Sequence, residues 1–313
     1  MPAPINWKSK IVLVKIETAE GVDAAPSGAL NAMVLTDVQL QPMEGEDVSR
    51  NLERPFMGGQ QELATGLRAV LTGSFELVGS GTAGIAPAWS PLLRACGVAE
   101  VITPNTSVEY SPVTDGHEAV SVHFYIGPSR HVLLGARATA VFTVNAQAIP
   151  VCRVTLTGLF VLPGDQPRPT VDTSKFQPPQ IASKANTPAF TIGGAPFVLR
   201  NFELNLGNDI QPRLLVGVER IIIADRNETL TATVEAVPYA TYNPFAIARD
   251  GTLQPIALQH GTNAGRRLAF TIQRAALKRP GAVDQNQNIV EWPLNFTPLP
   301  SDAGNDQWKI TLT

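Results

Sequence analysis

Short alternations of apolar and polar residues, broken by glycine and proline, run through the whole chain. The 313 residues include 25 Gly and 26 Pro, many of them at the ends of alternating stretches such as Met33–Gln41 and Leu67–Val78. A period of two puts every second side chain on one face of a strand, and Gly and Pro mark the turns between strands. The sequence therefore predicts a mainly β fold made of many short antiparallel strands.

A different spacing occurs within Ala88–Ala99, where apolar residues fall at i, i+3, i+4 and i+7. That spacing is typical of one face of a helix. We expect this helix to pack on the sheet, and a shorter helix-like element to lie in 239–248. The residues of the predicted packed face are Trp89, Leu92, Leu93 and Cys96.

The second half of the chain repeats features of the first half in the same order. The stretch VLTDVQLQP at 34–42 resembles VLRNFELNL at 198–206, with the alternation in the same phase. The other matched stretches are LTGSFEL at 71–77 with LTATVEA at 230–236, WSPLLRAC at 89–96 with YNPFAIAR at 242–249, and LTGLFVLP at 156–163 with PLNFTPLP at 293–300. Several weak matches in a fixed order indicate an internal duplication.

The segment PGDQPRPT at 163–170 is rich in proline and charge, which is typical of a boundary between domains. We therefore predict two tandem domains, residues 1–170 and 171–313, each an antiparallel β-sandwich or barrel with one packed helix. The alternative is that β-rich halves resemble each other only locally, since the chain length alone also permits one large domain.

The composition argues against catalytic, metal and nucleic-acid-binding sites. Charged residues make up only 16%, the net charge is −3, and no run of Lys and Arg supplies the cations of a phosphate-binding surface. The stretch GSGTAG at 79–84 lacks the Lys-Ser/Thr ending of a phosphate loop, and neither CxxC nor HExxH occurs. We expect no cofactor, no metal and no enzymatic activity, with a Ser-His-Asp site assembled in space as the open alternative.

Cys96 and Cys152 are too few for a disulfide framework, so we expect two reduced, partly buried thiols. The apolar core of the N-terminal stretch, IVLV at 11–14, is shorter than the roughly 7–15 residues of a signal peptide. The apolar runs are also too short to span a bilayer. We therefore expect a protein made and kept in a cytoplasm, with no membrane partner.

Residues 17–59, ETAEGVDAAPSGALNAMVLTDVQLQPMEGEDVSRNLERPFMGG, resemble the N-terminal part of the tail tube proteins of phages with long, non-contractile tails. The stretches GSGTAGIAPAWSPLLRACG at 79–97 and GNDQWKITLT at 304–313 resemble the same family, so the likeness covers nearly the whole chain. The resemblance implies a structural virion protein of the phage tail, assembled in the cytoplasm of the bacterial host. Its copies would stack as rings around a channel through which DNA passes without specific binding.

Within this siphovirus major tail protein family, the duplicated chain resembles the two-domain variety, in which three copies supply six tube domains. The resemblance implies a trimeric, pseudo-hexameric ring in which each sheet edge is paired by the next domain. The other partners it implies are the tape measure, terminator and baseplate proteins of the tail.

The stretch Pro42–Gly66 has little apolar periodicity, which predicts a long exposed loop. We expect this loop to reach an adjacent ring. Its counterpart at Gly207–Val218 is shorter, so the two halves should make unequal axial contacts and the ring should have threefold symmetry. The residues expected at the contact are Glu44, Glu46, Asp47, Arg50, Glu53, Arg54 and Phe56.

Two other functions stay open from the sequence. A baseplate or tail-terminator ring protein shares the tube fold and would stop at one ring instead of polymerising. A carbohydrate-binding β-sandwich on a phage or cell surface would need exposed aromatic side chains on one face. Aromatic residues make up only 6% of the chain, and several lie in apolar stretches.

Overall fold

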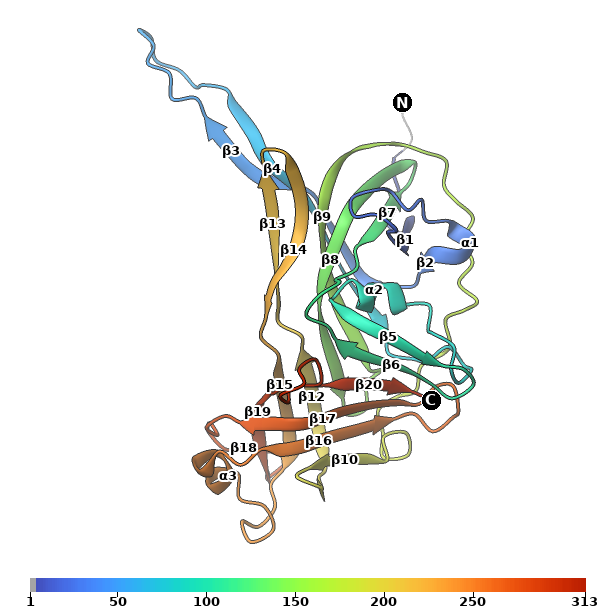
Figure 1. Cartoon of the computed structure of the whole chain (residues 1–313), viewed down its shortest axis with the longest axis vertical. Coiled ribbons are helices and arrows are strands. Elements are labelled where there is room, and N and C mark those ends of the chain that lie inside the picture. Colours follow the sequence, from blue (N-terminus) through green and yellow to red (C-terminus); the bar gives the residue numbers. More distant parts are fainter. Residues whose placement is uncertain (1–3) are drawn as a thin grey trace.

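The computed structural model describes residues 4–313. Strands make up 52% of it and helices 5%, which confirms the predicted mainly β class. Eighteen strands join in one sheet that curls into half a barrel, and two further strands form a separate small sheet. Figure 1 shows long strands of the first half running along the molecule and much of the second half crossing its lower end.

The first half of the chain contributes two short helices, α1 (Gly28–Asn31) and α2 (Ser90–Arg94). Its strands are β1 (Lys10–Ile16), β2 (Ala32–Met33), β3 (Thr36–Ser49), β4 (Glu62–Glu76), β5 (Val98–Thr103), β6 (Ser107–Pro112), β7 (Val120–Ile126), β8 (Ser129–Asn145) and β9 (Val151–Asp165). Residues 166–188 then form neither helix nor strand. The predicted domain boundary at residue 170 falls in this segment and stays a prediction.

The second half contributes the helix α3 (Pro244–Asp250). Its strands are β10 (Ala189–Ile192), β11 (Ala195–Pro196), β12 (Leu199–Asn205), β13 (Asn208–Leu215), β14 (Val218–Arg226), β15 (Thr229–Glu235), β16 (Gln254–His260), β17 (Leu268–Leu277), β18 (Asp284–Asn286), β19 (Ile289–Pro298) and β20 (Lys309–Leu312).

Both halves pair their strands in the same order, and every pair is antiparallel. The order is β2-β1-β7-β8-β9-β4-β3 in the first half and β11-β10-β16-β17-β19-β15-β12 in the second. Leu40 lies opposite Leu71 in β3–β4, and Leu204 lies opposite Leu230 in β12–β15. These are the positions that the repeated sequence stretches align, so the repeat in sequence coincides with a repeat in strand register.

The two halves join edge to edge. Strand β12 pairs with β15 on one side and with the end of β8 on the other, where 201–205 lie opposite 141–145. Strand β20 makes a second bridge, because it pairs with β17 and with β6. One hydrophobic core runs through both halves, and the ring of Phe142 lies 5.5 Å from that of Phe270 and 6.5 Å from that of Trp308.

The loop predicted over 42–66 is wrong at both ends. Strand β3 continues to Ser49 and β4 begins at Glu62. Together they form a projecting hairpin, and only its connecting loop, 50–61, is not strand (Figure 1). The shorter loop predicted over 207–218 is likewise replaced by the hairpin β13–β14. Solvent reaches both faces of much of these hairpins, so burial imposes no apolar alternation that the sequence could reveal.

The helix predicted within 88–99 is shorter than its apolar spacing suggests. α2 ends at Arg94, Gly97 adopts the left-handed conformation with φ +68°, and β5 begins at Val98. Glycine favours this conformation because it has no Cβ, and it commonly ends helices. In the second half α3 occupies 244–250, so the first part of the predicted 239–248 element is not helical.

Candidate assembly surfaces

The hairpin β3–β4 extends from the sheet as an arm, here named the first arm (Figure 1). At its base Glu44 lies opposite Arg68, and a carboxylate oxygen of Glu44 is 3.2 Å from Arg68 Nε. Further out, Glu46 and Asp47 are exposed on the same strand. The sequence predicts these three acidic residues in a loop, whereas in the structure they lie on the β3 strand of the arm.

The tip of the first arm, residues 50–61, exposes apolar side chains. Gln60 closes the tip, because its side-chain amide bonds both the N–H and the carbonyl of Leu52 at 2.7 Å. The side chains of Phe56 and Met57 are 66% and 102% exposed, and the Arg54 guanidinium lies 5.9 Å from the Phe56 ring centre. The other predicted contact residues of the tip are Arg50 and Glu53, both exposed.

The hairpin β13–β14 forms a second arm, which rises beside the base of the first (Figure 1). It ends in a two-residue turn at Val216–Gly217, where Gly217 has φ +96° and Val216 is fully exposed. The arms meet at Gly66, which also has positive φ, and a Cβ there would lie 4.0 Å from Leu214. The two arms therefore leave the sheet on one side of the molecule but differ in length and in their tips.

The base of the second arm is anchored to the first half. Asn208 lies opposite Arg226, whose Nε donates to the Asn208 side-chain oxygen at 2.8 Å. Arg226 also donates to the carbonyls of Cys96 and Gly97, at 3.1 and 2.7 Å, where the chain leaves α2. The Asn208 amide donates to the carbonyls of Cys96 and Ala138 at 2.7 and 2.9 Å.

Strands β3 and β12 occupy matching positions but differ in their neighbours. β12 has a partner on each edge, whereas β3 pairs only with β4 among the strands of residues 4–313. Phe202 and Leu204 of β12 are fully buried, whereas the matching Val38 and Leu40 are only half-buried. The outer edge of β3 is thus an open edge of the sheet.

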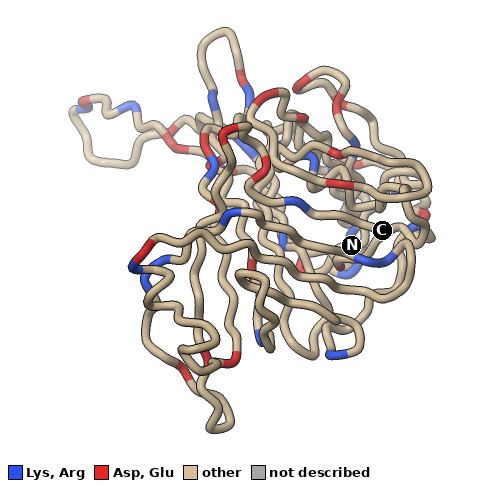
Figure 2. Tube along the Cα trace, turned by 60° about the horizontal axis from the view of Figure 1, so that its bottom comes forward, with Lys and Arg blue, Asp and Glu red and all other residues tan. Residues whose placement is uncertain are grey.

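The face of the sheet that points away from the core is mostly uncharged and crosses both halves. One row of directly opposed residues runs Ser74, Arg153, Val141, Asn205, Thr229 through β4, β9, β8, β12 and β15. Neighbouring positions on this face are Thr72, Glu76, Thr139, Thr143, Thr155, Thr157, Asn201, Glu203, Thr231, Thr233 and Glu235. Figure 2 shows both signs of charge interspersed around the chain.

The residues of the predicted helical face lie in the core beside α2. Trp89, Leu92, Leu93 and Cys96 are at most 2% exposed, and the Trp89 indole N–H donates to the carbonyl of Val78 at 2.8 Å. Burial raises the pKa of the Cys96 thiol to about 12, and the Arg226 charge opposes that shift. Cys152 is also buried and free, so neither thiol is available for reaction in the folded chain.

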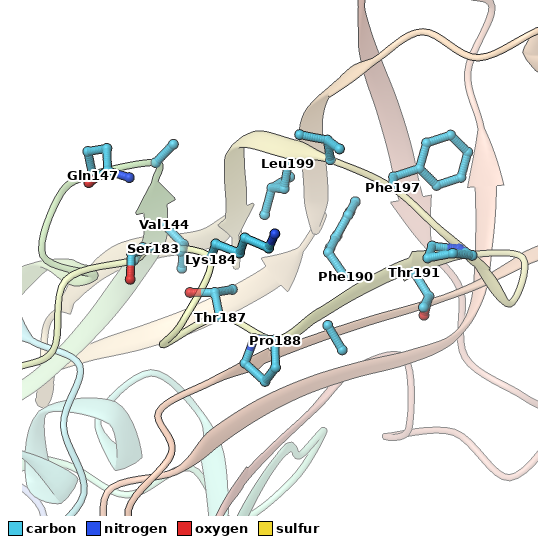
Figure 3. Close-up of a pocket in the computed structure, with 15 residues that line it drawn as sticks. Val144, Gln147, Ser183, Lys184, Thr187, Pro188, Phe190, Thr191, Phe197 and Leu199 are labelled. Atoms are coloured by element: carbon cyan, nitrogen blue, oxygen red, sulfur yellow. The ribbon is translucent and has the colours of Figure 1, made fainter.

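A cavity of about 530 Å³ lies beyond the β8–β12 junction (Figure 3). The side chains of Val144, Phe190 and Leu199 line it, and Lys184 is the one charged residue in its lining. Within residues 4–313 there is no cluster of three or more His, Cys, Asp and Glu side chains arranged to hold a metal ion. No helix in that range is long and apolar enough to cross a membrane.

An unpaired strand edge and exposed apolar side chains at the arm tips are surfaces at which a protein can associate with another chain. Comparison with protein-family models gives a match over residues 7–298 to the family described as phage tail tube protein. The chain belongs to the phage tail tube protein family. Comparison with curated protein sequences found no match. Tail tube proteins are structural components of the phage tail, and this family is not a family of enzymes.

Proposed function

We propose that three copies of this chain close into a ring of six similar units, and that such rings stack into the tube through which the phage genome passes. The observation that carries the proposal is the matched pairing order of the two halves, joined edge to edge where β8 meets β12. A chain built this way still has the open edge of β3, and closure into a ring pairs every such edge.

The outward face of the sheet supports the channel. On and beside the row from Ser74 to Thr229 its charged residues are Glu76, Glu203 and Glu235 with Arg153, and the rest are mainly Thr, Asn and Ser. Arg68 and Arg137 lie on the same face nearer the arms, where each forms an ion pair, with Glu44 and Glu20 respectively. DNA phosphates are held where clustered cations release counterions, so a wall with few cations lets a duplex slide. This face is our proposal for the lumen wall.

The arms support stacking of the rings. Phe56 and Met57 are adjacent at the tip and largely exposed, so the tip presents two neighbouring large apolar side chains suited to burial against another surface. We propose that the first arm inserts its tip into an adjacent ring, with Glu44, Glu46, Asp47, Arg50, Glu53 and Arg54 fixing its orientation. The terminator, tape measure and baseplate proteins would then contact the ends and the interior of the tube.

Electron microscopy of the purified chain tests the proposal. The expected result is open-ended hollow tubes whose rings have threefold symmetry. Single rings that never stack would support a tail-terminator or baseplate protein instead, and monomers at all concentrations would overturn the proposal.

A further inference from the structure

The junction between the two halves, where β12 pairs with β8, can be compared with the surfaces that the chain leaves open. Because the two halves pair their strands in the same order, each surface that one half offers at the internal junction has a counterpart on the other half. β12 with the second arm docks on the first half, so its counterpart, β3 with the first arm, lacks a docking partner within residues 4–313.

The strongest correspondence lies at the bases of the arms. Asn208 opposite Arg226 is the first pair of the second arm, and Glu44 opposite Arg68 holds the same place in the first arm. Each pair also joins an arginine to an oxygen of its partner, at 2.8 Å for Arg226 and 3.2 Å for Arg68. The Arg226 side chain is 12% exposed because carbonyls at the end of α2 surround it, whereas that of Arg68 is 31% exposed.

We propose that the open edge of β3, residues 37–41, and the Glu44–Arg68 pair dock on the second half of a neighbouring copy, where α3 ends and β17 runs past β16. This inference rests on the proposed ring. Arg68 then donates to the backbone carbonyls of Asp250 and Gly251 of the neighbour, as Arg226 donates to those of Cys96 and Gly97 within the chain.

The receiving side has a similar but shorter strand extension. Strand β8 continues beyond Ala136, its last residue paired with β7, to Asn145, and β12 pairs with that extension. Strand β17 continues beyond Ala275, its last residue paired with β16, only to Leu277. The carbonyls at the end of a helix have no intrahelical partner and accept hydrogen bonds from an arginine. Gly251 is left-handed like Gly97, so the chain leaves both helices in a similar way.

The charges at the two surfaces are complementary. Asp37 and Glu46 add negative charge beside the Glu44–Arg68 ion pair on the β3 side. Lys278 and Arg279, both exposed, add positive charge after β17 on the receiving side, near the Arg249–Asp250 ion pair. Opposite charges across an interface orient partners and suppress wrong pairings. One contact must be replaced on docking, because the Lys10 ammonium now bonds the Val38 carbonyl at 2.9 Å. A flexible lysine side chain can give way to a neighbouring strand.

Substitution of Arg68 gives the first test. Arg68→Ala should lower the affinity between copies by about tenfold or more, since hydrogen bonds from a charged donor are lost, and should leave the melting temperature within about 2 °C. Sedimentation velocity over a concentration series measures the affinity. Arg153→Ala, which removes the same charge away from the interface, should assemble like the wild type, and Arg226→Ala should lower the melting temperature instead.

Cross-linking gives a second test that does not depend on affinity. Gln41→Cys combined with Arg279→Cys should give covalent ladders up to trimers with a short bismaleimide, whereas either substitution alone should not. The native thiols of Cys96 and Cys152 are buried, so they should not react with the cross-linker. Tubes formed equally well by Arg68→Ala, together with no ladder, would overturn this inference alone. A wild type that never associates would overturn the proposed function as well.

Discussion

Strands β3 and β12 are matching strands in different surroundings, and the difference shows what the isolated chain lacks. β12 lies between β15 and β8, and its Phe202 and Leu204 are fully buried. β3 has one neighbour, and the matching Val38 and Leu40 are half-buried. The arms that continue these strands differ in the same sense, because the second arm lies against its own chain and the first extends into solvent (Figure 1). The edge of β3 in the first half is therefore open to solvent, whereas the matching edge of β12 in the second half is paired within the chain.

Making the first arm like the second should have the largest effect. Replacing residues 50–61 by Asn-Gly, a sequence that favours a two-residue hairpin turn, removes the exposed tip and keeps the strands. We expect rings that no longer stack, seen by electron microscopy, with an unchanged melting temperature. Val216→Asn, which alters the tip of the second arm, is the matched control and should still allow tubes. Tubes of normal length from the shortened first arm would show that its tip makes no contact between rings.

The matching leucines allow the surroundings of the two strands to be compared directly. Leu204→Ala should lower the free energy of unfolding by about 2–5 kcal/mol, because it leaves a cavity in a closed core. Leu40→Ala should cost less, about 1–2 kcal/mol in the monomer, since its side chain is only partly buried. Chemical denaturation of the dilute monomer measures both values. Equal losses would mean that β3 is as well covered as β12.

Lysines added to the outward sheet face should make the proposed lumen wall bind duplex DNA. Thr155→Lys in the first half and Thr231→Lys in the second each add a cation to every copy around the proposed lumen. We expect wild-type tubes to show no salt-sensitive affinity for duplex DNA, and the double variant to retain DNA at low salt and release it as salt rises. Retention assays over a salt series measure this, and strong salt-dependent binding by the wild type would contradict the conduit.

The smallest effect concerns two histidines on matching strands, His123 of β7 and His260 of β16. Burial lowers the pKa of both from the ordinary value near 6.5, and for His123 the Asp23 carboxylate, 3.0 Å away, opposes that shift. The unfolded chain therefore binds protons that the folded chain does not. Their contribution to stability is intact above pH 6.5 and is lost as the pH falls through the lowered pKa values.

Each of these histidines should change the free energy of unfolding by at most about 1.4 kcal/mol per pH unit. We expect His260→Gln to reduce the loss of melting temperature between pH 7 and pH 5 more than His123→Gln does, because the Thr187 hydroxyl, rather than a carboxylate, is hydrogen-bonded to the His260 ring. Thermal denaturation at several pH values measures the difference. Identical pH profiles for both variants and the wild type would exclude this contribution.

The sequence predicted several strands that have one buried face, although it missed β6, β16 and β20. Alternation along 67–78 places Leu71, Phe75 and Leu77 in the core, and all three are buried. The outer part of the first arm was not predicted as strand because cross-strand hydrogen bonds, rather than burial, hold a hairpin that is exposed on both faces. The second arm was missed because what it packs against is distant in the sequence. The apolar spacing that reaches Cys96 suggested a longer helix, although Cys96 enters the core from the turn that follows α2. The spacing of apolar residues indicates which side chains are buried, but it does not indicate whether the backbone at each of them is helix or turn.

The surfaces were harder to predict than the strands. The charged stretch 44–56 was found from its composition, but Arg68 was missed because it lies in a strand that alternates normally. A signal did exist, since the aligned repeats place Arg68 near Arg226. The role of Arg226 depends on its hydrogen bonds to residues about 130 positions away, and a local sequence pattern cannot predict such contacts.

The covalent link between the halves would also affect the kinetics with which the proposed ring forms. The β8–β12 junction forms within one molecule, at an effective concentration set by the linker 166–188 rather than by the number of copies in the cell. In a ring of three chains, half of the six junctions therefore exist before any two molecules meet. Three junctions remain between chains, of which two form by encounters and the third closes within the trimer. Six separate units would need about five encounters, so the loss of translational and rotational freedom that accompanies each encounter is incurred less often.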